Sequence, residues 1–187
     1  MAFDVRRLGP DDLPAYRALR LRGLAAHPDA FTSSADEEAA KPAESLARRL
    51  AHDPSRPQDA LFGAFDGAAL VGVAGVDVDP RAKTRHKGHV YGMFVDDAHA
   101  GRGIGRSLVR RVIAHATDAG LRQLVLTVTD GNDAAQRLYE RAGFAACGRE
   151  PQAVVVDGRA LDKITMVLFL PAAQAPLPPR PIPPEPR

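Results

Sequence analysis

The stretch of residues 89–107 constrains the fold of this chain more than any other. It reads HVYGMFVDDAHAGRGIGRS, so a β-branched and aromatic segment runs into a glycine-rich turn and then into a helical pattern. From Ile104 onward apolar residues recur at helical spacing, and Gly120 is placed to end the helix. The sequence therefore predicts a buried strand, a tight turn and an amphipathic helix, in that order.

This order favours an anion site at the start of the helix. Gly101, Gly103 and Gly105 let a ligand approach the main chain, and the first turn of a helix leaves backbone N–H groups without intrahelical partners. Those donors and the positive end of the helix dipole suit a phosphate or a pyrophosphate. Arg102 and Arg106 are spaced four apart, so they can lie on one face beside the ligand.

The glycines alone leave other interpretations open. They are also compatible with an ordinary strand-to-helix turn whose arginines form a solvated face. The P-loop fits less well, because no Lys-Ser/Thr pair follows the last glycine. The GxGxxG phosphate loop also fits less well, because the spacing here is GxGxG.

A second motif, at Asn132 to Phe144, decides between these interpretations. It reads NDAAQRLYERAGF, and together the two stretches resemble the GNAT superfamily of N-acetyltransferases. In that family the acetyl-CoA loop reads Q/R-x-x-G-x-G/A, and the next helix reads N-x-x-A-x-x-L-Y-x-x-x-G-F. The helix pattern matches at every fixed position. The loop matches at Gly103 and Gly105 but has Ala100 where the family usually has glutamine or arginine.

The resemblance implies a fold and a domain organisation. The fold is α/β (α+β): a mixed, mostly antiparallel sheet of about seven strands flanked by about four helices. Residues 1–170 would form the GNAT domain, and residues 171–187 a Pro-rich tail that is extended and peripheral.

Turn and capping residues predict the remaining elements. Asp66-Gly67 and Asp157-Gly158 are suited to tight hairpin turns, and Asn132 is suited to cap a helix. Two early helices are expected: one has Pro14 in its first turn, and the other begins near Pro42. Strands are expected at residues 3–8, 60–65, 68–77, 123–128, 144–156 and 161–170, the fourth of them covered on both faces.

The resemblance also implies acetyl-CoA as cosubstrate, with no metal. The loop backbone would bind the pyrophosphate, and the pantetheine arm would pair like an extra strand with the backbone of Met93 and Val95. The Val95 amide would then donate to the thioester oxygen, and Asn132 would hydrogen-bond the arm. The residues expected to bind acetyl-CoA are Met93, Phe94, Val95, Gly101, Arg102, Gly103, Ile104, Gly105, Arg106, Ser107 and Asn132.

By the same resemblance, Tyr139 is the general acid that protonates the CoA thiolate. Asn132 and Tyr139 are seven residues apart, so two helical turns place them on one face, about 10 Å apart along the axis. A phenol has an unperturbed pKa of about 10 and stays protonated at neutral pH. From the residues alone, Asn132 is equally an N-cap and Tyr139 equally a core aromatic residue.

The expected general base is His89, at a strand position where several family members have a glutamate. An imidazole with an unperturbed pKa of about 6.5 accepts a proton at neutral pH. Tyr91 faces the same way and would assist through a water chain. A packed or surface role for His89 stays open, and Asp77, Asp157 and Asp162 are alternatives that could instead attract a cationic amine.

Composition excludes several classes of protein. The chain has 25 basic and 23 acidic residues, so no strong overall charge favours nucleic acid or membrane partners. Its single cysteine, Cys147, excludes an internal disulfide. No apolar run is long enough to span a bilayer, and the N-terminus lacks a signal-peptide profile, so we expect a cytoplasmic protein.

The predicted function is an N-acetyltransferase that acts on a primary amine of a small molecule or peptide. A non-catalytic acetyl-CoA sensor and a nucleotide-binding protein are the competing hypotheses. The sequence does not identify the amine, and a homodimer through the last strands is common in the family.

Overall fold

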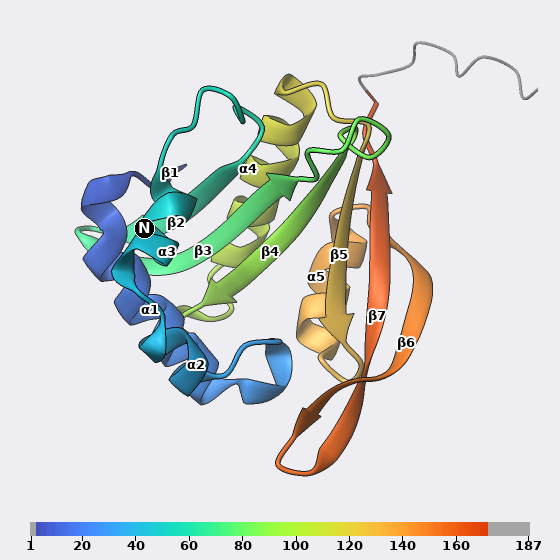
Figure 1. The fold of residues 1–187 in the computed structure, drawn as a ribbon. Helices are drawn as coiled ribbons and strands as arrows, with labels where there is room; N and C mark the ends of the chain where they lie inside the picture. The colour runs from blue at the N-terminus through green and yellow to red at the C-terminus, as the bar shows by residue number, and fades with distance from the viewer. Residues whose placement is uncertain (1–2, 172–187) are drawn as a thin grey trace, which may run out of the picture.

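Seven strands form one mixed sheet in the computed structural model of this chain, which describes residues 3–171 (Figure 1). The strand order is β1-β2-β3-β4-β5-β7-β6, and β4 and β5 are the parallel pair among otherwise antiparallel neighbours. The strands are β1 Asp4–Arg7, β2 Ala60–Asp66, β3 Ala69–Val78, β4 Lys87–Val95, β5 Gln123–Thr129, β6 Ala145–Val156 and β7 Arg159–Phe169.

Helices cover both faces of this sheet. They are α1 Leu13–Ala26, α2 Ala35–Ala40, α3 Ala43–Leu50, α4 Ile104–Asp118 and α5 Asp133–Arg141. One core cluster joins the apolar side of α4 and α5 to β2, β3 and β5. A second cluster joins α1 and α3 to the opposite face of β2 and β3. The buried stripe predicted for α4 is therefore confirmed, with Leu108 and Val112 fully buried.

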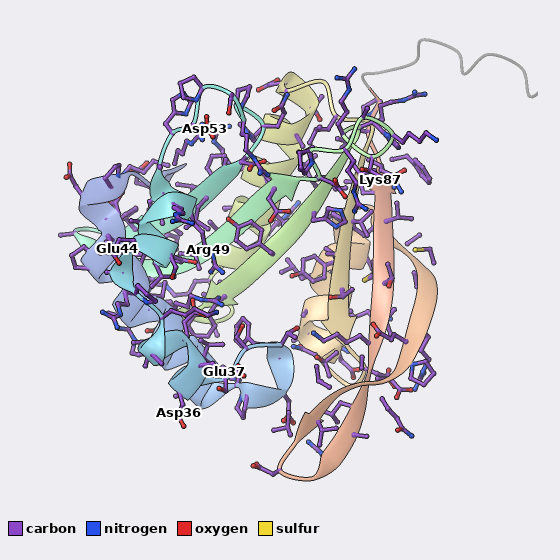
Figure 2. The ribbon with its side chains drawn as sticks, viewed as in Figure 1. Asp36, Glu37, Glu44, Arg49, Asp53 and Lys87 are labelled. Atoms are coloured by element: carbon purple, nitrogen blue, oxygen red, sulfur yellow. The ribbon has the colours of Figure 1, made fainter. Side chains whose placement is uncertain are left out.

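The parallel pair β4 and β5 separates after a short paired segment. Lys87, Gly88 and His89 pair with β5, and beyond His89 the two strands diverge (Figure 1). Lys87 marks the paired end of β4 in Figure 2. The divergence opens the sheet in its middle, between its β1–β4 and β5–β7 halves.

A β-bulge in β4 accompanies the divergence. Between Tyr91 and Phe94, β4 has one more residue than the facing part of β3, and Gly92 has a φ of +62°. The extra residue reverses the alternation of side chains. Val90 and Met93 pack with the α4 core, whereas Tyr91 and Phe94 pack with the α1–α3 core.

One predicted hairpin turn and the predicted helix cap are confirmed, and the other hairpin turn is shifted by one residue. Asp157-Gly158 joins β6 to β7 with positive φ at both residues, as predicted, whereas the turn between β2 and β3 is Gly67-Ala68, one residue later than predicted, because Asp66 still pairs with Ala69. The Asn132 side chain caps α5 by accepting the N–H of Ala135 at 3.1 Å.

Three details differ from the sequence predictions. The acidic segment before Pro42 is itself a helix, α2, because Ser34 and Glu37 form a reciprocal capping box. Strand β5 is not covered on both faces, since Thr127 is exposed where β4 has diverged. The expectations for the Pro-rich tail fall almost wholly on residues 172–187, outside the described part of the chain.

Candidate active site

A cavity of about 760 Å³ lies where β4 and β5 diverge, and it brings together residues of both halves of the sheet. A volume of this size suits a small-molecule site. Val90, Tyr91, Gly92 and Met93 line it from β4, and Thr127, Val128, Asn132, Ala135 and Tyr139 line it from β5 and α5. Further walls come from α1, α3 and the segments that follow these two helices.

The backbone of β4 presents unpaired hydrogen-bonding groups on the side of this opening. Asp96 donates its N–H to Val71 on β3 at 2.9 Å. Because backbone groups alternate in direction along a strand, those of Met93 and Val95 point to the opposite edge, from which β5 has moved away. An extended ligand can pair with that edge as a further strand would.

The start of α4 offers backbone donors to an anion. Gly103 is the N-cap residue with a φ of +82°, and no side chain caps the helix there. Ser107 is the first helical residue whose N–H bonds to a carbonyl in the helix, that of Gly103, so the N–H groups of Ile104, Gly105 and Arg106 have no helical partner.

The space around the same turn also fits a phosphate group. A Cβ atom at Gly101 or Gly103 would meet no atom within 4 Å, so the main chain is open to a ligand. Arg106 is exposed beside the turn, whereas Arg102 pairs with Asp66 at 3.2 Å and lies over Phe3. The predicted anion site thus has its donors in place, with one of the two arginines already engaged in an ion pair.

Close packing at Gly105 brings the two sequence motifs together. A Cβ atom there would lie 3.2 Å from the side chains of Leu138 and Met93. The first turn of α4 therefore sits directly against α5 and β4. This contact sets the glycine turn beside the cavity that Tyr139 lines.

Tyr139 is 6% exposed and packs edge-on against Phe144 at 5.8 Å. Burial raises the pKa of its hydroxyl above the ordinary value, so the phenol is protonated at neutral pH. Asn132 lines the same cavity and also caps α5, so its structural role is present whether or not it contacts a ligand.

The predicted base lies at the border of the cavity. His89 is exposed and pairs in register with Asp77 on β3. Asp77 and Tyr91 line the cavity, whereas His89 is not among the described residues that do so. Burial raises the pKa of the Asp77 carboxyl, and the nearby Asp59 raises it further. Asp157 and Asp162 are also not among those lining residues.

One wall of the cavity contains a buried charge cluster that the sequence did not reveal. Glu38 is fully buried and accepts hydrogen bonds from Arg20 at 2.5 Å and Lys41 at 2.8 Å, with Arg49 at 3.6 Å. Burial alone would raise the pKa of Glu38, but these cations outweigh it and lower the pKa to about 2. In the sequence, Glu38 is one of two adjacent glutamates in a short acidic helix, and nothing in that pattern distinguishes it from the exposed Glu37.

The segment after α1 crosses the opening and contacts the far half of the sheet. Thr129 donates to the carbonyl of Asp29 at 2.7 Å, Arg159 pairs with Asp29 at 2.6 Å, and Lys163 donates to Thr32 at 2.5 Å. These contacts close one side of the cavity. Burial lowers the pKa of Lys163, which lines the cavity as well.

Two further findings concern residues 3–171. No three His, Cys, Asp or Glu side chains gather there in a way that could hold a metal ion, and the absence of a metal requirement stays a prediction. Within that same range, none of the helices has both the length and the apolar character needed to cross a membrane.

Comparisons with known proteins agree with this geometry. Residues 24–144 match the model of the acetyltransferase (GNAT) family. A mycothiol acetyltransferase of Geodermatophilus obscurus is 34% identical over 140 residues, which are 74% of this chain and 42% of that protein. The L-methionine sulfoximine/L-methionine sulfone acetyltransferase of Salmonella typhimurium is 36% identical over 86 residues, 46% of this chain and 50% of that protein.

A solved structure has the same fold. The phosphinothricin acetyltransferase of Sinorhizobium meliloti, in complex with acetyl-CoA, superimposes with a TM-score of 0.80 at 20% identity, over 98% of this chain and 97% of that one. This chain spans less than half the length of the mycothiol acetyltransferases that it matches.

Proposed function

Because the chain belongs to the acetyltransferase (GNAT) family, we propose that it transfers an acetyl group from acetyl-CoA to the primary amine of a small molecule or peptide. One observation carries this proposal: β4 and the buried Tyr139 line one cavity, and the uncapped start of α4 packs at Gly105 against β4 and α5 beside it. We expect the reaction to take place in the cytoplasm. Homodimerisation through β6 and β7, and the absence of nucleic acid and membrane partners, stay predictions.

The residues present fit the parts of acetyl-CoA. Backbone N–H groups of residues 104–106 would hold the pyrophosphate, with Gly101 and Gly103 leaving room for it and with Ser107, Arg102 and Arg106 beside it. The edge of β4 at Met93, Phe94 and Val95 would hold the pantetheine arm, and Asn132 would contact that arm from α5.

In the proposed mechanism, bound acetyl-CoA supplies a thioester whose carbonyl carbon is attacked by the amine. The Val95 N–H donates to the carbonyl oxygen as negative charge develops on it. Tyr139 gives its hydroxyl proton to the departing sulfur, and its burial supports this role because the hydroxyl stays protonated until that moment. His89 accepts the proton of the amine through water, since it borders the cavity without lining it.

An assay of CoA release tests the proposal. Release from acetyl-CoA should depend on a primary amine in a broad panel of polyamines, amino acids and peptides. No amine-dependent release, with acetyl-CoA still bound, would instead support the sensor hypothesis. Acetyl-CoA should also raise the melting temperature more than ATP or NAD, because a ligand that binds only the folded state stabilises it. A larger shift with a nucleotide would support the nucleotide-binding hypothesis.

The choice of base makes a separate prediction. His89→Ala should lower kcat/KM by about 100-fold, which is the lower end of the range for general base catalysis. His86→Ala, in the loop before β4, is the matched control and should have little effect. If Asp77→Asn causes the loss instead, the base is Asp77. In that case the wild-type rate should fall as pH drops through the raised pKa of Asp77, and Asp77→Asn should remove this dependence.

A further inference from the structure

We propose that the acceptor amine also carries a carboxylate, as an amino acid does, and that Arg49 binds this carboxylate. The inference rests on the proposed function and narrows its acceptor. It follows from the charges that surround the cavity. Five basic side chains and three acidic side chains line it: Arg20, Arg48, Arg49, Arg56 and Lys163, with Asp53, Asp59 and Asp77.

The positive charges on the α3 side of the cavity exceed the negative charges available to them. Glu38 is the carboxylate that contacts Arg20, Lys41 and Arg49, so one negative charge faces three positive charges. Lys41 does not line the cavity, whereas Arg20 and Arg49 do. Arg48 adds another positive charge to the same wall. An anionic ligand would balance this excess.

Arg49 is the best placed of these cations to bind a carboxylate. Its Nη1 donates to the hydroxyl of Tyr16 at 3.3 Å, and its guanidinium lies 5.8 Å from the ring centre of Tyr91. Figure 2 shows Arg49 extending from α3 over the sheet. Arg20 already uses two nitrogens on Glu38. A fixed guanidinium with donors to spare matches the two oxygens of a carboxylate.

Acidic side chains line the same cavity. Asp77 lines it from β3, and Asp59 precedes β2. Asp59 pairs with Arg56 at 2.6 Å and accepts the N–H of Val78, which leaves Asp77 as the carboxylate that faces a cationic amine. With Arg49 and Asp77 both in its lining, the cavity suits a molecule with a carboxylate and an ammonium group. A polyamine would instead place a positive charge against the arginines.

The test compares amino acids with their carboxamides, which keep the amine and the size but lose the negative charge. At saturating acetyl-CoA, kcat/KM for the best of L-methionine, L-leucine and L-glutamine should exceed that for its carboxamide by about 10- to 100-fold, the range expected for charge-assisted hydrogen bonds. Arg49→Gln should bring this ratio close to one. Lys41→Gln removes a charge from the same cluster outside the cavity lining, and it should leave the ratio as in the wild type.

A binding measurement separates this inference from the proposed function. Calorimetry with N-acetyl amino acids and their carboxamides, in the presence of CoA, reports the carboxylate preference without turnover and without a titrating amine. Tighter binding of the acid that is lost in Arg49→Gln supports the inference, even if no amine is acetylated and the proposed function fails. Acetylation of amines with equal or better binding of the carboxamide would overturn the inference and leave the proposed function intact.

Discussion

Replacing Tyr139 with phenylalanine is expected to lower kcat by about 100- to 10,000-fold, the range for loss of a general acid. The phenylalanine ring can keep the edge-on contact with Phe144, so the substitution removes little more than the hydroxyl. Tyr139 also lines the cavity, where the reacting groups are expected. The measurement is steady-state turnover with the best amine of the panel.

Two controls show whether this loss is chemical. Acetyl-CoA binding and the unfolding midpoint of Tyr139→Phe should match those of the wild type, because the side chain stays buried and apolar. The wild-type rate should also show no fall from ionisation of Tyr139 near pH 10, since burial raises the pKa of that hydroxyl above its usual value. Unchanged turnover in the variant would remove Tyr139 from the mechanism.

Replacing Glu38 with glutamine is expected to lower the free energy of unfolding by about 3–5 kcal/mol, the usual cost of removing one partner from a buried ion pair. Glu38 is fully buried, and its loss would leave Arg20 and Arg49 facing each other without a counter-charge. Denaturation by urea measures the change. Asp36→Asn, on the exposed side of the same helix, should change the free energy by no more than about 0.5 kcal/mol. Equal effects of the two variants would contradict the role given to Glu38.

The same cluster makes stability depend on pH in one direction. The pKa of Glu38 is lowered from 4.5 to about 2 in the folded state, so its contribution is fully present above pH 4.5. That contribution is lost as the pH falls through about 2. Glu38→Gln should therefore differ most from the wild type near neutral pH, and the difference should shrink in acid.

Much of the fold was predictable because its signals are local. The hairpin dipeptide Asp157-Gly158, the apolar spacing of α4 and the cap at Asn132 depend on residues close in the sequence. The glycine turn and the helix with Tyr139 were also read from the sequence, and the structure places them side by side through the contact at Gly105.

The rest depends on contacts between distant segments. Glu38 is buried because α1 and α3 bring Arg20 and Arg49 onto it, and no pattern within α2 reveals this. The bulge at Gly92 became visible only from the register of β4 against β3. The placement of Asp77 inside the cavity and of His89 at its border also depends on where β4 and β5 separate.

A crystal structure of this chain with acetyl-CoA tests the central claim most directly. The claim predicts pyrophosphate oxygens within about 3.2 Å of the backbone nitrogens of residues 104–106, and the thioester between β4 and Tyr139. A pyrophosphate bound away from the start of α4, or an acetyl group remote from Tyr139, would contradict it.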